Sequence, residues 1–217
     1  MELRPDDLPP RERYKLLIGC IVPRPIAFVS TISLDGRPNL APFSFFSGIG
    51  SDPLTLLFCP SNAPDGSEKD TLRNCKPIAE GGQGQFVVNA AIEEYAREVA
   101  ACGEALPPHE SEWDLARLAS APSRLVKPAR VAQSPWAFEC ETVQVVRTNP
   151  GRPAGGNVVI GRVVHVFLDD AVVAPTLRVD PDRLHAIARM GGFAYARTRE
   201  RFELPPDRSA LDQPPPF

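Results

Sequence analysis

The sequence predicts a mainly β, barrel-like domain with short helices around it. Asp35-Gly36 joins two extended runs, at 20–33 and 37–46, and such a dipeptide is typical of a tight hairpin turn. Two long alternating runs, at 137–147 and 157–168, are joined by a Gly/Pro-rich turn. The chain has 217 residues, which suits one domain. We therefore expect a single domain over residues 1–217, with a core at about 15–200 and proline-rich arms at both ends.

The N-terminal part should lead from a short helix into the hairpin. Residues 11–18 allow the helix, and Pro23 and Pro25 exclude one at the start of the following strand. The returning arm alternates Phe with Ser and contains Pro42. Because proline cannot donate to a strand ladder, Pro42 indicates an edge, a bulge or a turn of the backbone toward a ligand.

The middle of the chain alternates strands with short helices. Residues 54–59 form a continuous apolar run that predicts a buried strand. A polar loop follows, and Asp70 or Thr71 is the start signal of the next helix, with Asp70 as its cap. We expect a strand at 85–89 and a helix at 92–102, where apolar residues recur with helical spacing.

The C-terminal half contains the two long strands. Residues 103–135 are interrupted by prolines and predict a loop with one helical piece near 113–119. A helix is expected at 181–189, because Pro181 suits a first helical turn and Asp180 suits a cap. The prediction is thus one barrel-like domain with helical covers.

Composition excludes several classes of protein. A net charge of −3 leaves no basic surface for nucleic acid. The sequence has no long apolar run and no signal-peptide pattern, so we expect a soluble cytoplasmic protein with no membrane partner. Five scattered cysteines without a close pair predict free thiols rather than a zinc site or a disulfide framework.

The common catalytic motifs are missing as well. The segment at 81–86 has the wrong glycine spacing for a dinucleotide-binding loop, and no phosphate-binding loop or serine nucleophile motif occurs. The three histidines lie far apart in the sequence, which gives no basis for a metal site. His165, inside an alternating run, is interpreted as a core or interface residue.

Six blocks in order resemble the flavin reductase-like family and its flavoredoxin-like branch. They are PRPIAFVST (23–31), NLAPFSFFSGI (39–49), KDTLRN (69–74), FVVN (86–89), GRVVHVFLDD (161–170) and GGFAYART (191–198). The resemblance implies an FMN-binding split β-barrel, Greek-key-like, with short peripheral helices. It also implies a homodimer in which NADH or NADPH reduces FMN, and FMN passes electrons to an acceptor or an electron-transfer protein. No catalytic side chain is needed, because the flavin N5 carries the chemistry.

The returning arm of the hairpin is the main candidate for the flavin surface. Small residues allow close approach, and Ser44 and Ser47 offer hydroxyls; the alternative is an ordinary edge strand. The resemblance places flavin contacts on both arms of the hairpin. The predicted contacts there are Ser30, Thr31, Asn39, Leu40, Ala41, Pro42, Phe43, Ser44 and Ser47.

The phosphate is expected at the loop that leads into the helix near residue 70. Unpaired N–H groups at a helix start favour an anion, and Ser61, Lys69, Asp70 and Thr71 are the candidates. The alternative is a plain helix cap with a solvated lysine. Asn74 is interpreted as structural and Arg24 as exposed.

The resemblance brings a late segment toward the cofactor too. It implies that Tyr195 and Arg197 contact FMN, across a dimer interface if one forms. The alternative from the residues alone is a packed C-terminal strand. Two other functions stay open: an FMN carrier or sensor without turnover, and a barrel that has lost its cofactor site.

Overall fold

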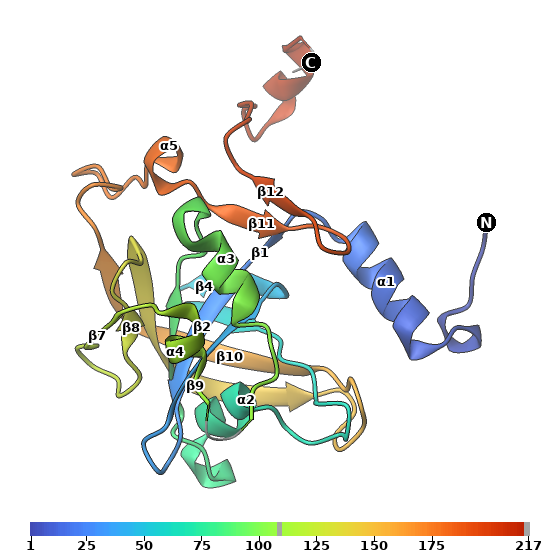
Figure 1. Cartoon of the computed structure of the whole chain (residues 1–217). Coiled ribbons are helices and arrows are strands. Elements are labelled where there is room, and N and C mark those ends of the chain that lie inside the picture. Colours follow the sequence, from blue (N-terminus) through green and yellow to red (C-terminus); the bar gives the residue numbers. More distant parts are fainter. Residues whose placement is uncertain (108–109, 215–217) are drawn as a thin grey trace.

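A seven-stranded antiparallel sheet dominates the computed structural model, which describes residues 1–107 and 110–214. Its strand order is β3-β2-β6-β9-β10-β5-β4, and Figure 1 shows its two long strands, β9 and β10, side by side. The strands are β2 (Ala27–Ile32), β3 (Pro38–Phe43), β4 (Phe46–Ser51), β5 (Leu54–Phe58), β6 (Gln85–Asn89), β9 (Trp136–Arg147) and β10 (Asn157–Leu168). The predicted hairpin and both long strands are confirmed, and the fold is mainly β as expected.

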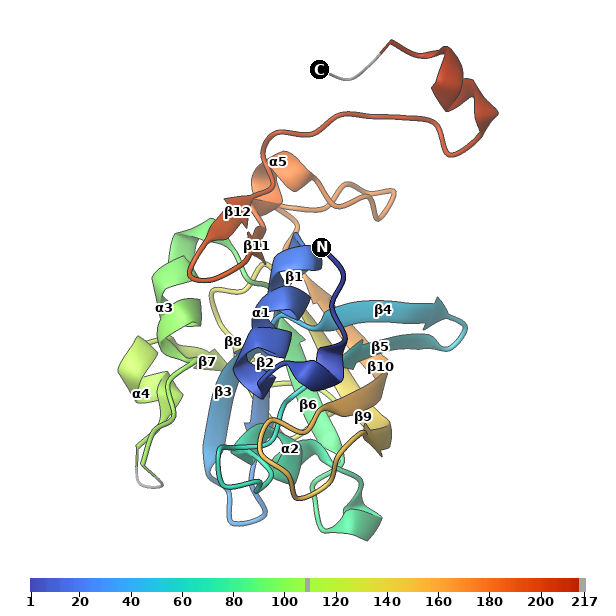
Figure 2. The ribbon, with the colours of Figure 1, turned by 90° about the vertical axis from the view of Figure 1, so that its right-hand side faces the viewer.

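Shorter elements surround this sheet (Figure 2). Two small sheets are formed by β1 (Arg24–Pro25), β11 (Ile187–Arg189) and β12 (Tyr195–Arg197), and by β7 (Ser120–Ala121) and β8 (Arg130–Val131). The α-helices are α1 (Pro10–Cys20), α2 (Asp70–Cys75), α3 (Ala96–Ala101), α4 (Glu112–Ala116) and α5 (Pro181–Leu184). Single 3-10 turns lie at Pro5–Asp7, Ile78–Glu80, Glu93–Tyr95 and Arg208–Asp212.

Alternate residues of β2 and β3 face two different hydrophobic clusters. Phe28 and Leu40 pack with α3, α4 and β11 on one face of the sheet. Val29 packs with Phe58 and Phe86 on the other face, which α2 covers. Side chains alternate across a strand, so each cross-strand pair of this hairpin belongs to one face only. This alternation decides which predicted site residues can act together.

Gly161 in β10 makes room for an aromatic ring of the second cluster. A Cβ atom at this position would lie 2.3 Å from Phe86 Cζ, closer than any real contact. Phe86 in turn packs edge-on against Phe58, with ring centroids 5.1 Å apart. The glycine is therefore a packing requirement of the barrel interior.

Three details differ from the sequence predictions. The helix expected at 181–189 ends at Leu184, because His185 has φ 48 and Ile187–Arg189 pairs as strand β11 with β1 and β12. β4 extends the edge of the large sheet, where no strand was expected beyond residue 46. β5 is not uniformly buried, since Leu54 is exposed and Leu56 and Phe58 are buried: one face of this strand is covered by the core and the other is open.

The two ends of the chain stand away from the body. α1 projects from one side, and the segment after β12 rises from one end of the molecule (Figures 1 and 2). No residue of α1 is buried. All five cysteines are free, as predicted, and three of them are buried. No helix in residues 1–107 or 110–214 is long and apolar enough to cross a membrane.

Candidate functional site

Three of the predicted site residues meet in one hydrogen-bonded cluster between β2, β3 and α2. The Asn39 side-chain amide donates to Thr31 Oγ1 over 3.3 Å and to Thr71 Oγ1 over 3.0 Å. Asn74 also donates to Thr31 Oγ1, over 3.1 Å. All four residues are buried. Asn74, interpreted from the sequence as structural, thus belongs to the same cluster as the predicted contacts Thr31 and Thr71.

Two other predicted residues lie on the opposite face of the same hairpin. Ser30 is buried and donates its hydroxyl proton to the Ala129 carbonyl over 2.5 Å. Leu40, paired with Ser30 across the hairpin, is fully buried in the first hydrophobic cluster. In this structure both side chains support the fold. A one-residue step along a strand reverses the face, which reasoning from the motif alone did not resolve.

The end of β3 and its turn into β4 give the half-exposed surface. Residues 41–46 are all partly buried, and Ser47 is exposed. β3 lies at the free edge of the sheet, where Glu112 Oε2 accepts a hydrogen bond from Leu40 N over 3.3 Å. Pro42 has no N–H to offer. A further strand therefore cannot pair with this edge at Leu40 or at Pro42. This agrees with the interpretation of Pro42 as an edge residue. Phe43 and Ser44 remain partly accessible.

Arg24 is buried, which corrects the expectation that it is exposed. Only 3% of its surface is accessible. Its guanidinium donates to the Ile18, Ile21 and Met190 carbonyls and to Ser44 Oγ. Burial lowers the pKa of the Arg24 guanidinium from its ordinary value. Local sequence does not show this burial, because two of the four acceptors, Ser44 Oγ and the Met190 carbonyl, come from distant segments of the chain.

The loop between β5 and α2 is held in place by a buried amide pair. Asn157, at the start of β10, donates to Asn62 Oδ1 over 2.9 Å and to the Pro60 carbonyl over 3.0 Å. Asn62 itself donates to the Arg152 carbonyl over 3.0 Å. Both asparagines are buried. Sequence reasoning missed this pair, and the one available signal was an asparagine at the start of an apolar strand.

Ion pairs fix the other end of the loop. Arg147 Nη2 lies 2.9 Å from Glu68 Oε1, and Lys76 Nζ lies 2.9 Å from Glu68 Oε2. Burial by itself would raise the pKa of the Glu68 carboxyl, but the hydrogen bonds from Lys76 and Arg147 hold it below its ordinary value. The loop is therefore a positioned element rather than a free connection.

The predicted phosphate residues lie along this loop. Ser61 and Lys69 are exposed. Lys69, not Asp70, is the residue before the first turn of α2, and no side chain caps this helix. Asp70 lies inside the first turn and pairs with Arg73. The expected capping role of Asp70 is therefore wrong, since its carboxylate is oriented along the helix toward Arg73.

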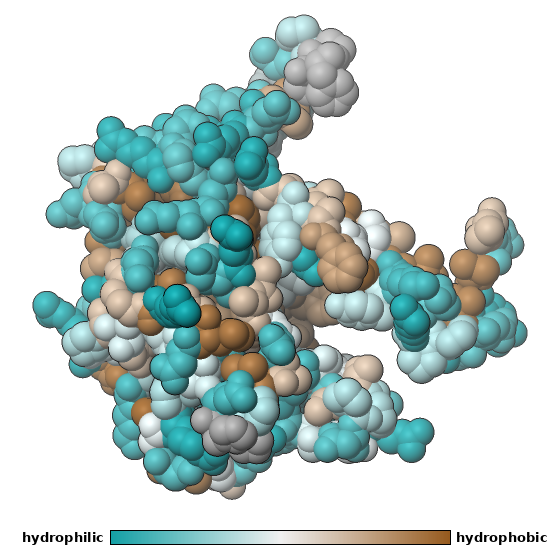
Figure 3. All heavy atoms as spheres, in the orientation of Figure 1, coloured by the Kyte–Doolittle hydropathy of each residue, from teal (hydrophilic) through white to brown (hydrophobic). Residues whose placement is uncertain are grey.

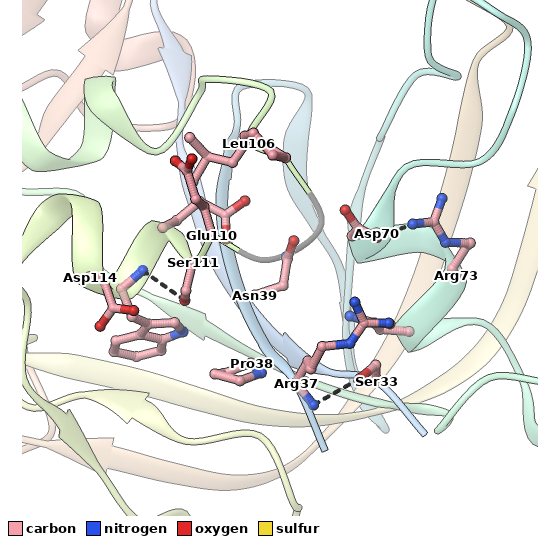
Figure 4. Close-up of a pocket in the computed structure, with 14 residues that line it drawn as sticks. Ser33, Arg37, Pro38, Asn39, Asp70, Arg73, Leu106, Glu110, Ser111 and Asp114 are labelled. Carbon is pink, nitrogen blue, oxygen red and sulfur yellow. Dashed lines mark hydrogen bonds and ion pairs between the residues drawn. The ribbon is translucent and has the colours of Figure 1, made fainter. Parts of the chain in front are cut away.

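A cavity of about 450 Å³ opens beside the polar cluster (Figure 4). β3, α2 and the segment around α4 line it, and Asn39, Asp70 and Glu112 are among the lining residues. Burial raises the pKa of the Glu112 carboxyl. No sequence pattern indicated the contribution from the segment around α4. The lining residues not predicted as site residues are Ser33, Arg37, Pro38, Arg73, Asn74, Leu106, Pro107, Glu110, Ser111, Glu112, Trp113 and Asp114.

The late segment lies apart from the polar cluster, on the sheet formed with β1 and β11. Tyr195 is partly exposed, and the Arg189 guanidinium stacks over its ring at 4.5 Å. Arg197 Nε lies 3.2 Å from Glu93 Oε2. His165 Nδ1 lies 3.2 Å from Glu139 Oε1 inside the long strand pair, in keeping with a structural histidine.

The donor set suits a flavin better than a metal or a nucleophile. In the part of the chain that the structure describes, no cluster of His, Cys, Asp or Glu could hold a metal ion. The half-exposed corner from Ala41 to Ser47 instead offers small residues, a proline and hydroxyls. Phe43, Phe45 and Phe46 lie in the same segment.

The family model for the flavin reductase like domain matches residues 18–188. The chain belongs to the flavin reductase-like family. The match covers most of the flavin reductase-like chain and includes the hairpin, the loop before α2 and both long strands. The resemblance that the sequence blocks indicated is confirmed.

Relatives and solved structures agree with this assignment. The flavin reductase-like chain is 37% identical over 98% of its length to an uncharacterized protein of Halalkalibacterium halodurans, of which it covers 99%. It is 35% identical to the uncharacterized protein YwrF of Bacillus subtilis, over 92% of this chain and 95% of that one.

Among solved structures, nitrilotriacetate monooxygenase component B from Bacillus cereus has a TM-score of 0.86 and 31% identity, over 94% of this chain and 98% of that one. A flavin reductase with a split barrel domain from Shewanella frigidimarina has a TM-score of 0.78 and 18% identity, over 94% of this chain and 98% of that one. The second likeness shows the fold alone, which is the split barrel that we expected.

Proposed function

We propose that this chain is an FMN-dependent oxidoreductase that takes electrons from NADH or NADPH and passes them to an acceptor. Bound FMN supplies the redox chemistry, since N5 of its ring accepts a hydride and the reduced ring returns two electrons. The chain's own task is to bind the ring, orient it and leave one face open. We assign no acid–base or nucleophilic step to a side chain.

One observation supports the proposal most strongly. Residues that the family motif associates with flavin come from β2, β3 and α2, and three of them form one hydrogen-bonded cluster, through Asn39. The turn from β3 into β4, residues 41–47, provides the binding surface. The loop between β5 and α2 provides donors for the phosphate through Ser61 and Lys69. We assign the phosphate to the side chains of that loop rather than to the start of α2. This helix has only six residues, so its dipole contributes little to anion binding.

We further propose a homodimer in which the partner completes the flavin site. α1 has no buried residue, yet Tyr14, Leu16 and Leu17 on it are apolar and exposed. The space-filling view shows α1 standing away from the body, with an open recess below it (Figure 3). A helix that exposes several large apolar side chains is typical of a subunit interface. Tyr195 and Arg197 would reach the flavin from such an arrangement.

The acceptor is proposed to lie outside the chain. The relative of known structure with 31% identity is named as component B of a monooxygenase, and a component works together with another protein. Reduced FMN released by this chain, or electrons passed through it, would serve such a partner.

An absorption spectrum of the purified protein tests the proposal. Oxidised FMN added to the apo-protein should bind, and NADH or NADPH added without oxygen should bleach its visible bands. Failure of the folded protein to bind FMN would rule out the cofactor assignment. Binding without bleaching by either nicotinamide, followed by bleaching with dithionite, would instead favour an FMN carrier or a protein reduced by a partner.

A further inference from the structure

Arg24 is a buried cation whose hydrogen bonds all go to neutral acceptors. Nη1 donates to the Ile18 carbonyl over 2.6 Å and to the Ile21 carbonyl over 2.7 Å. Nη2 donates to the Met190 carbonyl over 3.0 Å. Within residues 1–107 and 110–214, no carboxylate is paired with this guanidinium, and the ionisable groups that act on it are Tyr14 and Arg189.

These bonds join Arg24 to the end of α1, which directly precedes it, and to Met190, which is 166 residues away in the sequence. Ile18 and Ile21 lie at the end of α1, where the last carbonyls of a helix have no partner in the helix itself. Met190 directly follows β11, which leads into the hairpin that carries Tyr195. A planar guanidinium with donors in fixed directions can hold such a set at once, which explains why α1 keeps its position without burying a residue.

The fourth bond of Arg24 reaches the proposed flavin surface. Nε donates to Ser44 Oγ over 3.1 Å. The serine oxygen therefore accepts from a charged donor, and within the described part of the chain no acceptor takes the serine proton. A hydroxyl polarised in this way is a stronger donor toward a third group. Ser44 lies half-exposed next to Phe45, whose ring is 5.8 Å from the guanidinium carbon.

We propose that Arg24 is a positioning residue that fixes the Ser44 hydroxyl as a hydrogen-bond donor toward an acceptor atom of the flavin. The inference rests on the proposed function and specifies that Ser44 is the donor in its hydrogen bond with the flavin. The acceptor atoms of the flavin ring become richer in electrons on reduction, so the Ser44 donor favours reduced FMN over oxidised FMN. Arg24 thereby influences both the affinity for FMN and the reduction potential of the bound cofactor.

A double-mutant cycle between Arg24→Met and Ser44→Ala tests this coupling. The readouts are the dissociation constant of FMN, from fluorescence titration of the apo-protein, and the midpoint potential of the bound flavin. We expect each single variant to bind oxidised FMN roughly tenfold more weakly, as for one lost charge-assisted hydrogen bond. The double variant should lose about the same tenfold rather than a hundredfold, because both changes remove one contact.

The potential gives a readout that a purely structural role would not move. If reduced FMN loses about ten times more affinity than oxidised FMN, the midpoint potential falls by about 30 mV for a two-electron couple. That shift should disappear when Arg24→Met is made in the Ser44→Ala background. Arg162→Met is the matched control, because Arg162 lies on β10 in an exposed pair with Glu141.

Arg24→Lys covers the case in which Arg24→Met does not fold. A lysine keeps the charge but cannot satisfy four acceptors, so we expect a folded protein with weakened FMN binding and reduced coupling to Ser44. Additive losses, or unchanged affinity and potential in a folded Arg24 variant of a wild type that binds FMN, would overturn the inference alone. A folded wild type that does not bind FMN would overturn the proposed function and this inference together.

Discussion

Asn39 and Thr71 are 32 positions apart in the chain, yet the amide of one donates to the hydroxyl of the other over 3.0 Å. This bond joins the returning arm of the hairpin to the first turn of α2. The strand that carries the proposed flavin surface and the loop that carries the proposed phosphate donors are therefore held in one relative position. Substitutions in the loop and in the hydrogen-bonded cluster should therefore have separable effects on FMN affinity and on the free energy of unfolding.

Lys69→Ala should weaken FMN binding while leaving the melting temperature unchanged, because Lys69 is exposed. Thr71→Ala should lower the free energy of unfolding by about 1 kcal/mol, since a buried hydrogen bond is lost. The double variant should bind FMN weakly and remain folded. Fluorescence titration and thermal melting distinguish these effects. Unchanged FMN affinity of Lys69→Ala, at an unchanged melting temperature, would place the phosphate elsewhere.

Glu68→Gln should destabilise the protein at neutral pH by about 1–3 kcal/mol, because Glu68 accepts hydrogen bonds from two cations. The pKa of Glu68 in the folded protein is below its ordinary value. Its contribution to stability is therefore present above that ordinary value, 4.5, and is lost as the pH falls through the lowered one. Urea unfolding of both proteins at several pH values measures this, and a constant difference across the acid range would contradict it.

Glu112→Gln should show the opposite pH dependence. The pKa of Glu112 in the folded protein is raised from 4.5, so the folded state binds more protons and wild-type stability falls as the pH rises above that value. Glutamine can still accept the hydrogen bond from Leu40 N. The stability of the variant relative to wild type should therefore increase as the pH rises above 4.5 and through the raised pKa of Glu112. A relative stability that decreases as the pH rises above 4.5 would refute the assignment.

Gly161→Ala should destabilise the barrel, because the new Cβ would collide with the Phe86 ring. Overpacking of this kind costs about 1–3 kcal/mol. Gly48→Ala in β4 is the control, since nothing lies within 4 Å of a Cβ there. Chemical unfolding compares the two, and equal stabilities of the two variants would show that Phe86 moves aside without cost.

Leu17→Glu should dissociate the proposed dimer and weaken FMN binding with it, because a charge in an apolar interface is not compensated. Light scattering coupled to size exclusion gives the molar mass of the wild type and the variant. Arg11→Glu places the same charge on the same helix at a residue that is already polar and exposed. A wild type that is monomeric at all concentrations would remove the dimer from the proposal.

Local patterns in the sequence were sufficient for most of the secondary structure. The Asp35-Gly36 turn, β6 and the two long strands lie where turn residues and period-two alternation indicated. The sequence pattern predicts helix through β11, because Pro181 and Asp180 do start a helix. Only pairing with β1 and β12 makes the following residues a strand. A three-residue strand has no periodicity of its own to detect.

The sequence by itself determined the family, the mainly β fold and the motif residues of the candidate site. Only the tertiary structure decided which of those residues are buried and which of them meet. It buries Ser30 and Leu40 on one face of the hairpin, and gathers Thr31, Asn39 and Thr71 on the other. It also buries Arg24, expected at the surface, where its guanidinium bonds to the end of α1, to Ser44 and to Met190. Burial and hydrogen bonding depend on partners distant in the chain, and the local sequence does not encode where those partners lie.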